Sequence, residues 1–273
     1  MSSTTLAFIG AGNMSRAIIG GLLNQGFSAN TLWATDRNAD AMQDLASQGM
    51  HTTSNNAEAV SHADVVILCV KPQVLKDVCV DLRDAVQARK PLIISVAAGI
   101  TTQSINEWLG GDVAVVRAMP NTPALVGEGA TGLFANADVS DEQKQLASNV
   151  ASATGLALWV NDEALIDSVT AVSGSGPAYY FLMMEAMIAA GEKLGLTAES
   201  AKALTLQTAL GAAKMAKESE FDPAELRRRV TSPNGTTEKA IESFLADGLP
   251  ATVEKALEAC ADRSKALAAE LAK

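Results

Sequence analysis

The chain has 273 residues and a net charge of −10, and 48% of its residues are hydrophobic while only 4% are aromatic. This length suits one large or two ordinary domains with aliphatic cores. The acidic balance argues against DNA or RNA as a partner, because phosphate binding needs a basic face. The longest apolar run of the N-terminal half is about six residues, far short of the roughly 20 that span a bilayer. The first residues lead directly into a predicted strand, with no room for a signal peptide, so we expect a soluble cytoplasmic protein.

The cysteines and histidines exclude several kinds of chemistry. Cys69, Cys79 and Cys260 form no C-x-x-C pair, and their odd number argues against a disulfide framework. Cys69 and Cys260 lie in apolar patterns typical of a core. The two histidines, His51 and His62, lie in polar segments predicted to be loops or helix ends. No cluster has the spacing of metal ligands, so we expect no metal site and no histidine-based nucleophile.

The first structural signal is a glycine-rich turn between a strand and a helix. Residues 6–9 form an apolar run of strand length, and residues 16–25 follow a helical pattern. Between them lie Gly10 and Gly12, the arrangement that places a dinucleotide pyrophosphate on a helix N-terminus. The third glycine of the usual fingerprint is replaced by Ser15, which is still small enough for close packing.

A second predicted strand, residues 31–35, ends about 20 residues beyond this turn, where the adenosine ribose is normally bound. Asp36 and Arg37 follow it directly. An acid at this place favours a free 2′-hydroxyl, whereas an arginine favours a 2′-phosphate. The choice between NAD and NADP therefore stays open, and Asp36 could also be a turn residue that closes the strand.

Further strands and helices alternate at the spacing of βαβ units. The strands are continuous apolar runs at residues 65–70, 92–96 and 113–117, and the helices are residues 39–48, 73–88 and 102–109. Such runs indicate a parallel sheet covered by helices on both faces. Ligands bind beyond the carboxyl ends of such strands, where the loops at residues 71–73, 97–99 and 119–123 could contact a cofactor or be plain turns.

After residue 161 the strand signal disappears. Helical periodicity covers residues 162–171, 177–194, 197–218, 222–230, 236–246 and 250–271. We therefore expect an α/β Rossmann-type NAD(P)-binding domain at residues 1–161 and an all-helical domain at residues 162–273. The helix around residues 181–188 is apolar nearly all round, which fits either a buried bundle core or a surface that faces a partner.

One loop near the C-terminus has the features of an anion site. Residues 231–235 carry hydroxyls, a proline, Asn234 and Gly235, and a helix begins at Thr236 or Thr237. The free N–H groups and positive dipole end of such a helix suit a small carboxylate. Gly235 permits close approach, and Asn234 tolerates a left-handed turn. The alternative is an ordinary, well-capped helix.

Five segments together resemble the pyrroline-5-carboxylate reductase family, and the similarity extends in order over essentially the whole chain. They are Gly10-Ala-Gly-Asn-Met14, Val70-Lys-Pro-Gln73, Arg117-Ala-Met-Pro-Asn-Thr-Pro123, Val172-Ser-Gly-Ser-Gly-Pro-Ala-Tyr179 and Val230-Thr-Ser-Pro followed by Gly235-Thr-Thr237. The family usually has Gly where this chain has Asn234. Asn is the best substitute at positive φ, so we expect the turn to be kept.

The resemblance implies reduction of 1-pyrroline-5-carboxylate to L-proline, the last step of proline biosynthesis, by a homodimer or a ring of dimers. It implies that Thr237 hydrogen-bonds the substrate nitrogen and that Ser232, Gly235 and Thr236 hold its carboxylate. The expected cofactor is NADPH, with NADH possible. Its expected contacts are Gly10, Gly12, Asn13, Met14, Thr35, Asp36, Arg37, Asn56, Val70, Lys71, Pro72, Ala97, Ala98 and Asn121.

The implied chemistry needs a hydride at the imine carbon and a proton on its nitrogen. A cyclic imine is basic enough to arrive protonated, so orientation by Thr237 suffices and no catalytic histidine is required. One rival is a β-hydroxyacid dehydrogenase of the 6-phosphogluconate dehydrogenase type. Such an enzyme needs a lysine soon after a glycine-rich segment, and here none follows Gly176 until Lys193. The other rival is a non-catalytic NAD(P)-binding regulator.

Overall fold

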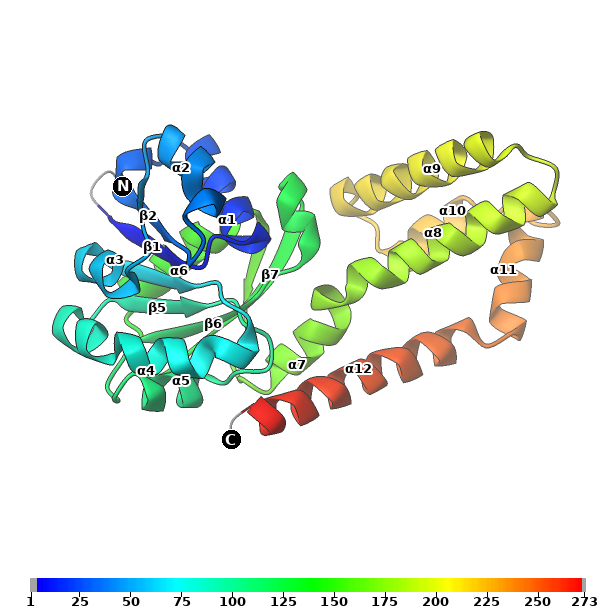
Figure 1. Cartoon of the computed structure of the whole chain (residues 1–273). Helices are drawn as coiled ribbons and strands as arrows, with labels where there is room; N and C mark the ends of the chain where they lie inside the picture. The colour runs from blue at the N-terminus through cyan, green and yellow to red at the C-terminus, as the bar shows by residue number, and fades with distance from the viewer. Residues whose placement is uncertain (1–3, 272–273) are drawn as a thin grey trace. The chain divides into compact units, whose positions relative to one another are not determined.

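The apolar runs of the N-terminal half form the central strands of one twisted sheet. The computed structural model describes residues 4–271 and divides into two units, one made of the residues up to 175 with those from 259 on, the other of residues 176–258 (Figure 1). The described part of the first unit contains an eight-stranded sheet of order β3-β2-β1-β4-β5-β6-β7-β8. Its strands are β1 (Leu6–Ile9), β2 (Leu32–Thr35), β3 (His51–Thr53), β4 (Val65–Leu68), β5 (Leu92–Ser95), β6 (Val115–Met119), β7 (Gly129–Ala135) and β8 (Gly155–Trp159).

The strands from β3 to β6 are parallel, so their carboxyl ends meet at one edge. β7 runs antiparallel to β6, and β8 is parallel to β7. The chain therefore returns to the edge of the sheet by a hairpin-like reversal after β6, a departure from the βαβ repeat. This reversal places the loop after β6 against β7.

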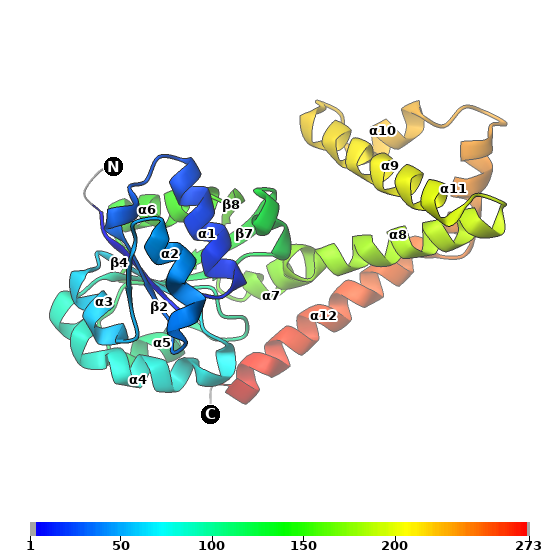
Figure 2. The same ribbon diagram turned by 45° about the horizontal axis from the view of Figure 1, so that its top comes forward.

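Two hydrophobic layers hold the sheet between helices. In β1, Leu6 and Phe8 face one layer with α1 (Asn13–Asn24), α2 (Gln43–Ser47) and α6 (Asp141–Ser152). Ala7 and Ile9 face the other layer, with α3 (Asn56–His62), α4 (Pro72–Arg89) and α5 (Thr102–Trp108). Figure 2 shows these two helix groups on opposite faces of the sheet. Full burial of one aliphatic side chain stabilises the fold by about 1.5–3 kcal/mol. Strands that are covered on both faces therefore carry apolar side chains at successive positions, which gives a continuous apolar run in the sequence.

Local signals fix where several helices begin. Pro72 lies in the first turn of α4, where its missing N–H costs no hydrogen bond. Ser140 and Gln143 form a capping box at the start of α6, each side chain bonding the other's backbone N–H. The hydroxyl of Thr101 accepts a hydrogen bond from the Ser104 N–H at the start of α5. Short 3₁₀ turns, η1 (Ala29–Thr31), η2 (Ala39–Met42) and η3 (Thr122–Val126), join other elements.

The predicted Rossmann-type fold followed by helices is confirmed, and the strands predicted around residues 6–9, 31–35, 65–70, 92–96 and 113–117 are each present within two residues. Three predictions need correction. The helix expected at residues 39–48 is a 3₁₀ turn followed by the five-residue α2. His51, expected in a loop or helix end, lies in the edge strand β3. The helix expected at residues 162–171 is shorter, because α7 (Leu165–Val169) passes into a π-helical turn, η4 (Thr170–Gly174).

Five elements were missed, namely β3, α3, β7, α6 and β8. Edge strands lack the apolar run because one of their faces is not covered. In β8 the burial alternates, and Leu156 and Leu158 are exposed.

The second unit consists of helices that bury little within this chain. It contains α8 (Gly176–Lys193), α9 (Ala198–Glu218), α10 (Pro223–Arg229), α11 (Thr236–Ala246) and the first part of α12 (Leu249–Leu271), whose last turns belong to the first unit. α8 and α9 pack closely, since a Cβ on Gly191 would lie 3.2 Å from that of Ala201. No described helix is long and apolar enough to cross a membrane.

The apolar helix predicted around residues 181–188 is α8, and its side chains are largely uncovered. Tyr180 is 70% exposed and Phe181 61% exposed. From α8 to α11 only Gly176, Ala201 and Thr205 are buried among the residues that the structure describes. A single chain therefore leaves a large apolar surface of the kind that normally binds another protein surface.

Two adjacent glycines of α1 give a matched test of the packing in the first unit. A Cβ on Gly21 would lie 2.0 Å from the carbonyl oxygen of Ala153, whereas a Cβ on Gly20 would meet nothing within 4 Å. We predict that Gly21→Ala lowers the free energy of unfolding by about 1–3 kcal/mol. Gly20→Ala, the control, should raise it by up to about 1 kcal/mol through helix propensity. Urea titration followed by circular dichroism measures both, and equal effects of the two changes would contradict this packing.

Candidate functional site

The turn between β1 and α1 is built around a glycine that no other residue can replace without strain. Gly10 has φ of +100°, and a Cβ there would lie 3.0 Å from the carbonyl oxygen of Cys69. Its N–H donates to the Thr35 carbonyl oxygen at 3.0 Å, which joins the ends of β1 and β2. Ser15, in place of the third glycine, is fully buried, and its hydroxyl donates to the Gly12 carbonyl at 2.8 Å. The altered fingerprint therefore keeps its tight turn.

The backbone at Gly12 is open to a ligand. A Cβ there would meet no protein atom within 4 Å, and no side chain caps α1, whose first residue is Asn13. The free N–H groups of that first turn are therefore available to an anion such as a pyrophosphate. The expected contacts Asn13 and Met14 lie in this turn. This geometry fits a dinucleotide cofactor.

A pocket of about 550 Å³ opens beside this turn, at the carboxyl ends of β1, β2 and β4. Eight of the residues expected from the sequence line it, namely Gly10, Gly12, Thr35, Asp36, Arg37, Asn56, Val70 and Lys71. The chain therefore gathers residues from four βα connections, those after β1, β2, β3 and β4, at the place where Rossmann folds bind cofactor.

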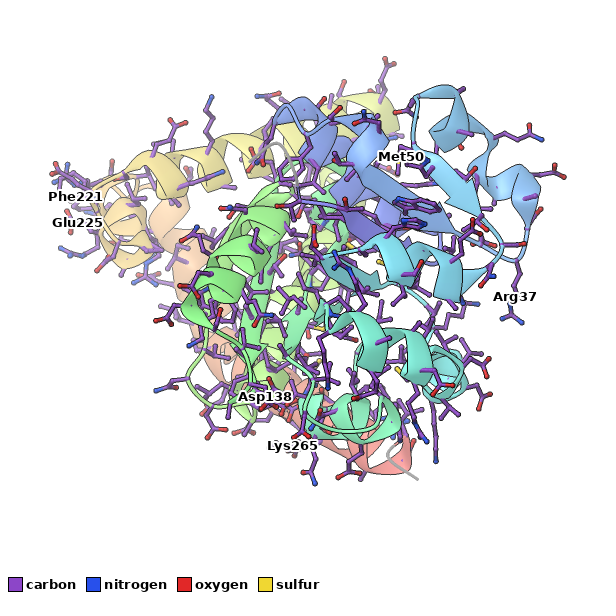
Figure 3. The ribbon with its side chains drawn as sticks, turned by 90° about the vertical axis from the view of Figure 1, so that its left-hand side faces the viewer. Arg37, Met50, Asp138, Phe221, Glu225 and Lys265 are labelled. Atoms are coloured by element: carbon purple, nitrogen blue, oxygen red, sulfur yellow. The ribbon has the colours of Figure 1, made fainter. Side chains whose placement is uncertain are left out.

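The end of β2 separates the roles of its two charged residues. The Asp36 carboxylate accepts hydrogen bonds from the N–H groups of Ala11, at 3.1 Å, and Asn38, at 3.0 Å. It thus fastens the glycine turn to β2. The side chain of Arg37 is exposed at the pocket and projects from the fold in Figure 3.

Asn56 is held in place by β2. The Thr35 hydroxyl donates to the Asn56 side-chain oxygen at 2.6 Å. Because Thr35 is fully buried, this bond fixes the first residue of α3 at the pocket wall.

The remaining expected cofactor residues lie outside this pocket. Pro72 begins α4, and Ala97 and Ala98 follow β5. Asn121 follows β6, and its side chain bridges two segments: its oxygen accepts from the Ala130 N–H at 2.9 Å, and its nitrogen donates to the Ser173 carbonyl at 3.0 Å. These two bonds hold the Asn121 side chain in place, and its second N–H and second lone pair stay available to a cofactor.

Sequence reasoning missed one wall of the pocket. Val74, Asp77, Val78 and Asp81 of α4 line it. They occupy positions i, i+3, i+4 and i+7, so they share one helix face. That spacing was visible in the sequence and could have identified the wall once residues 71–73 were placed beside it.

The second candidate site, in the other unit, is the start of α11. Asn234 has φ of +59°, which confirms that it takes the left-handed turn expected in place of glycine. Gly235 is the N-cap, its N–H donates to the Ser232 carbonyl at 3.0 Å, and no side chain caps the helix. The helix start thus has no hydroxyl cap from its N-cap residue, while the Glu238 carboxylate accepts a hydrogen bond from the Asn234 N–H at 2.7 Å.

The hydroxyl residues of this loop are open to solvent. Ser232, Thr236 and Thr237 are exposed around the helix start, with the first N–H groups of α11 beside them. The arginines at the end of α10 are partly engaged elsewhere: Arg228 and Arg229 pair with Glu225, and the hydrogen bond from Arg229 lowers the pKa of that carboxyl. Backbone N–H groups and hydroxyls are thus the donors offered to a small carboxylate here.

Comparison with known proteins identifies the family. The family model described as pyrroline-5-carboxylate reductase dimerisation matches residues 163–267, and that described as NADP oxidoreductase, coenzyme F420-dependent, matches residues 5–99. The chain is 57% identical over 272 residues to the pyrroline-5-carboxylate reductase of Pseudomonas aeruginosa, covering 99% of each chain. This chain belongs to the pyrroline-5-carboxylate reductase family.

Solved structures of the family share the whole fold. The reductase of Coxiella burnetii is 48% identical, with a TM-score of 0.94 over 97% of this chain and 99% of that one. The Plasmodium falciparum enzyme, whose structure has NADP bound, is 30% identical, with a TM-score of 0.86 over 98% of this chain and 99% of that one.

Two cysteines of the first unit, the half-buried Cys69 and the buried Cys79, give a test of the first site in solution. Burial raises the pKa of the Cys69 and Cys79 thiols from 9.0 to about 12. We predict that iodoacetamide at about pH 8 leaves both unmodified in the folded protein and alkylates them in urea, because the thiolate is the reactive form. The unfolded chain releases these protons at lower pH than the folded one, so the free energy of unfolding should fall as pH rises from 9.0 toward 12. Mass spectrometry of the alkylated peptides checks the first expectation, and rapid labelling of Cys69 in the folded state would contradict it.

Proposed function

We propose that this protein is an NAD(P)H-dependent pyrroline-5-carboxylate reductase, which converts 1-pyrroline-5-carboxylate to L-proline in the last step of proline biosynthesis. The observation that carries the proposal is the 57% identity to the Pseudomonas aeruginosa enzyme over 99% of both chains. The open helix start at Gly12 and the uncapped helix start at Thr236 supply the two binding sites that this reaction needs.

Cofactor binding and substrate binding fall in different parts of the sequence. Residues 1–161 bind the cofactor, and residues 162–273 bind the substrate and form the dimer. The pyrophosphate lies on the N-terminus of α1, against Gly10, Gly12, Asn13 and Met14, and the adenosine lies near the end of β2. The nicotinamide then lies toward the loops that hold Ala97, Ala98 and Asn121, while Val70, Lys71 and Pro72 form the wall between the two halves.

The substrate carboxylate binds at the start of α11. The N–H groups of the first turn and the positive end of the helix dipole stabilise its charge, with Ser232, Gly235 and Thr236 around it. The hydroxyl of Thr237 lies in the same exposed turn and hydrogen-bonds the ring nitrogen. Because Asn234 keeps the left-handed turn, the approach to this backbone is the same as with the usual glycine.

The reaction requires orientation of the substrate more than acid catalysis. The reduced nicotinamide supplies the hydride for the imine carbon. A cyclic imine arrives protonated at neutral pH, so the residues need to hold the carboxylate and the ring nitrogen in one geometry and exclude water. Thr237 orients and polarises the C=N bond, and Cys69, the thiol at the pocket, stays neutral because burial raises its pKa to about 12. The chain's residues therefore suit hydride transfer without a protein general acid.

The helical unit forms a homodimer, or a ring of such dimers. The exposed apolar side chains of α8 and α9, such as Phe181 and Leu210, leave a surface that a second copy would cover. The family model matched by residues 163–267 is itself described as a dimerisation domain. The three free thiols Cys69, Cys79 and Cys260 suit the reducing cytoplasm, where we place the enzyme.

The direct test is substrate-dependent oxidation of NADPH, followed by its near-ultraviolet absorbance. Rapid oxidation with racemic pyrroline-5-carboxylate, with proline as the product, is the expected result. Oxidation of a β-hydroxyacid with reduction of NADP⁺, and no reaction with pyrroline-5-carboxylate, would indicate a β-hydroxyacid dehydrogenase. A folded protein that binds NADPH and reduces nothing would indicate a regulator.

The role of Thr237 is tested by removing its hydroxyl. We predict that Thr237→Ala lowers kcat about tenfold, the value of one hydrogen bond made in the transition state, with little change in the free energy of unfolding. The matched control is Thr231→Ala in the same loop, whose hydroxyl already donates to the Arg227 carbonyl at 2.6 Å. Wild-type turnover in Thr237→Ala would refute the role.

We further propose that NADPH is preferred over NADH, and that Arg37 is the reason. The Asp36 carboxylate is occupied by the N–H groups of Ala11 and Asn38, which leaves the exposed Arg37 to bind a 2′-phosphate.

Replacement of the two charged residues should separate their roles. We predict that Arg37→Ala lowers kcat/KM for NADPH roughly 10- to 100-fold, as expected for one charge-assisted hydrogen bond, while kcat/KM for NADH stays within about twofold. Asp36→Ala should weaken both cofactors, because it frees the glycine turn. Steady-state kinetics with NADPH and with NADH measure these effects. An equal loss of kcat/KM for both cofactors in Arg37→Ala would contradict the role of Arg37 in binding the 2′-phosphate.

A further inference from the structure

We propose that Glu163 is a positioning residue for hydride transfer. Its carboxylate fastens together the two loops, residues 97–101 and 119–121, that flank the nicotinamide end of the cofactor site. This inference rests on the proposed reductase function, and it concerns a residue outside every motif that led to that function.

The Glu163 carboxylate accepts three hydrogen bonds from two residues, which lie in two different elements. Its Oε1 accepts hydrogen bonds from the Thr102 N–H at 2.8 Å and from Nη1 of Arg117 at 3.2 Å. Its Oε2 accepts from the Thr102 hydroxyl at 2.8 Å. The Arg117 side chain is only 4% exposed and that of Glu163 22%, so this cluster is largely withdrawn from water.

Each partner lies next to one of the two loops. Thr102 is the first residue of α5 and directly follows residues 97–101, which begin with Ala97 and Ala98. Arg117 lies in β6, two residues before Met119, where residues 119–121 begin. A single carboxylate therefore fixes the end of one loop and the start of the other.

These loops belong to the nicotinamide half of the site. The adenosine end of a dinucleotide lies over the end of β2 in a Rossmann fold, and the other end extends across the sheet. In the order β2-β1-β4-β5-β6 the loops after β5 and β6 lie on that far side. The Glu163 cluster is thus placed to affect one end of the cofactor and not the other.

The other end of the segment that begins at Glu163 also contacts residues 119–121. Residues 163–174 run from Glu163 through α7 to the π-helical turn, where the Ser173 carbonyl accepts from the Asn121 side chain at 3.0 Å. A Cβ on Gly174 would lie 2.5 Å from Cε of Met119, so the turn packs directly on that loop. Residues 119–121 are therefore held at both ends by this segment.

The buried Arg117 depends on Glu163 for its counter-charge. Removing the partner of a buried ion pair leaves an uncompensated charge, which forces Arg117 to move toward water. Thr102 at the same time loses the acceptor for its N–H and its hydroxyl. Both loops then relax, and a displacement of about 1 Å at a reacting centre can cost on the order of 100-fold in rate.

The experiment compares the two ends of the cofactor site in the full-length enzyme. Glu163→Ala removes the cluster, and Glu163→Gln keeps its volume and hydrogen-bonding oxygen but removes the charge. The readouts are kcat/KM for NADPH and the inhibition constant of 2′,5′-ADP, which carries the adenosine half and the 2′-phosphate but no nicotinamide.

Asp64→Ala is the matched control. Asp64 also accepts a backbone N–H, from Thr5 at 2.9 Å, and pairs with Arg89, but it lies at the amino ends of β1 and β4. It should lose stability without a change in either readout beyond about twofold.

We expect kcat/KM for NADPH to fall on the order of 100-fold in Glu163→Ala and by a smaller factor in Glu163→Gln, while the inhibition constant of 2′,5′-ADP stays within about twofold of wild type. Two results would overturn the inference: an unchanged kcat/KM in both variants, or a parallel rise in the 2′,5′-ADP constant, which would indicate general distortion. If Glu163→Ala does not fold, Glu163→Gln alone decides by the same criteria. A wild-type enzyme without reductase activity would refute the proposed function instead, so the two failures are distinguishable.

Discussion

The cofactor site depends on the left-handed turn at Gly10. Its N–H joins β1 to β2 through the Thr35 carbonyl, and a Cβ at this position would lie 3.0 Å from the Cys69 carbonyl oxygen after β4, so the glycine allows the close approach. Three parallel strands therefore end at one point, and α1 begins there with its first N–H groups unused. The residues expected to contact the adenosine half are positioned around this turn. Asp36 bonds the N–H of Ala11 in the turn, Arg37 follows Asp36, and Thr35 at the end of β2 holds Asn56 at the start of α3. A larger residue at this position would separate those strand ends.

The nicotinamide half is built differently. Its loops follow β5 and β6, and they are supported by a segment from beyond the last strand, through Glu163 and the π-helical turn at Thr170–Gly174. The last turns of α12 return to the same unit, where Leu267 lies against Gly99. The cofactor-binding unit is thus completed by residues from both ends of the helical part of the sequence.

The sequence predicted what local patterns encode. β1, β4 and β5 are buried on both faces and read as apolar runs, and the turn at Asn234 follows from that residue's tolerance of positive φ. The edge strands β3 and β8 gave no such signal, because one face is uncovered. Glu163 was beyond reach for another reason: its partners Thr102 and Arg117 lie 61 and 46 residues away, and no periodicity connects them. Only tertiary structure brings such residues together.

In the proposed function, the chain orients a direct hydride transfer from the nicotinamide to the imine carbon. The measurement that tests it most directly is the mass spectrum of proline formed with NADPH deuterated at the transferred position of its nicotinamide ring. The account predicts one deuterium in each proline molecule, at the carbon that carried the C=N bond. Proline that forms without the label, or with it at another carbon, would contradict the account.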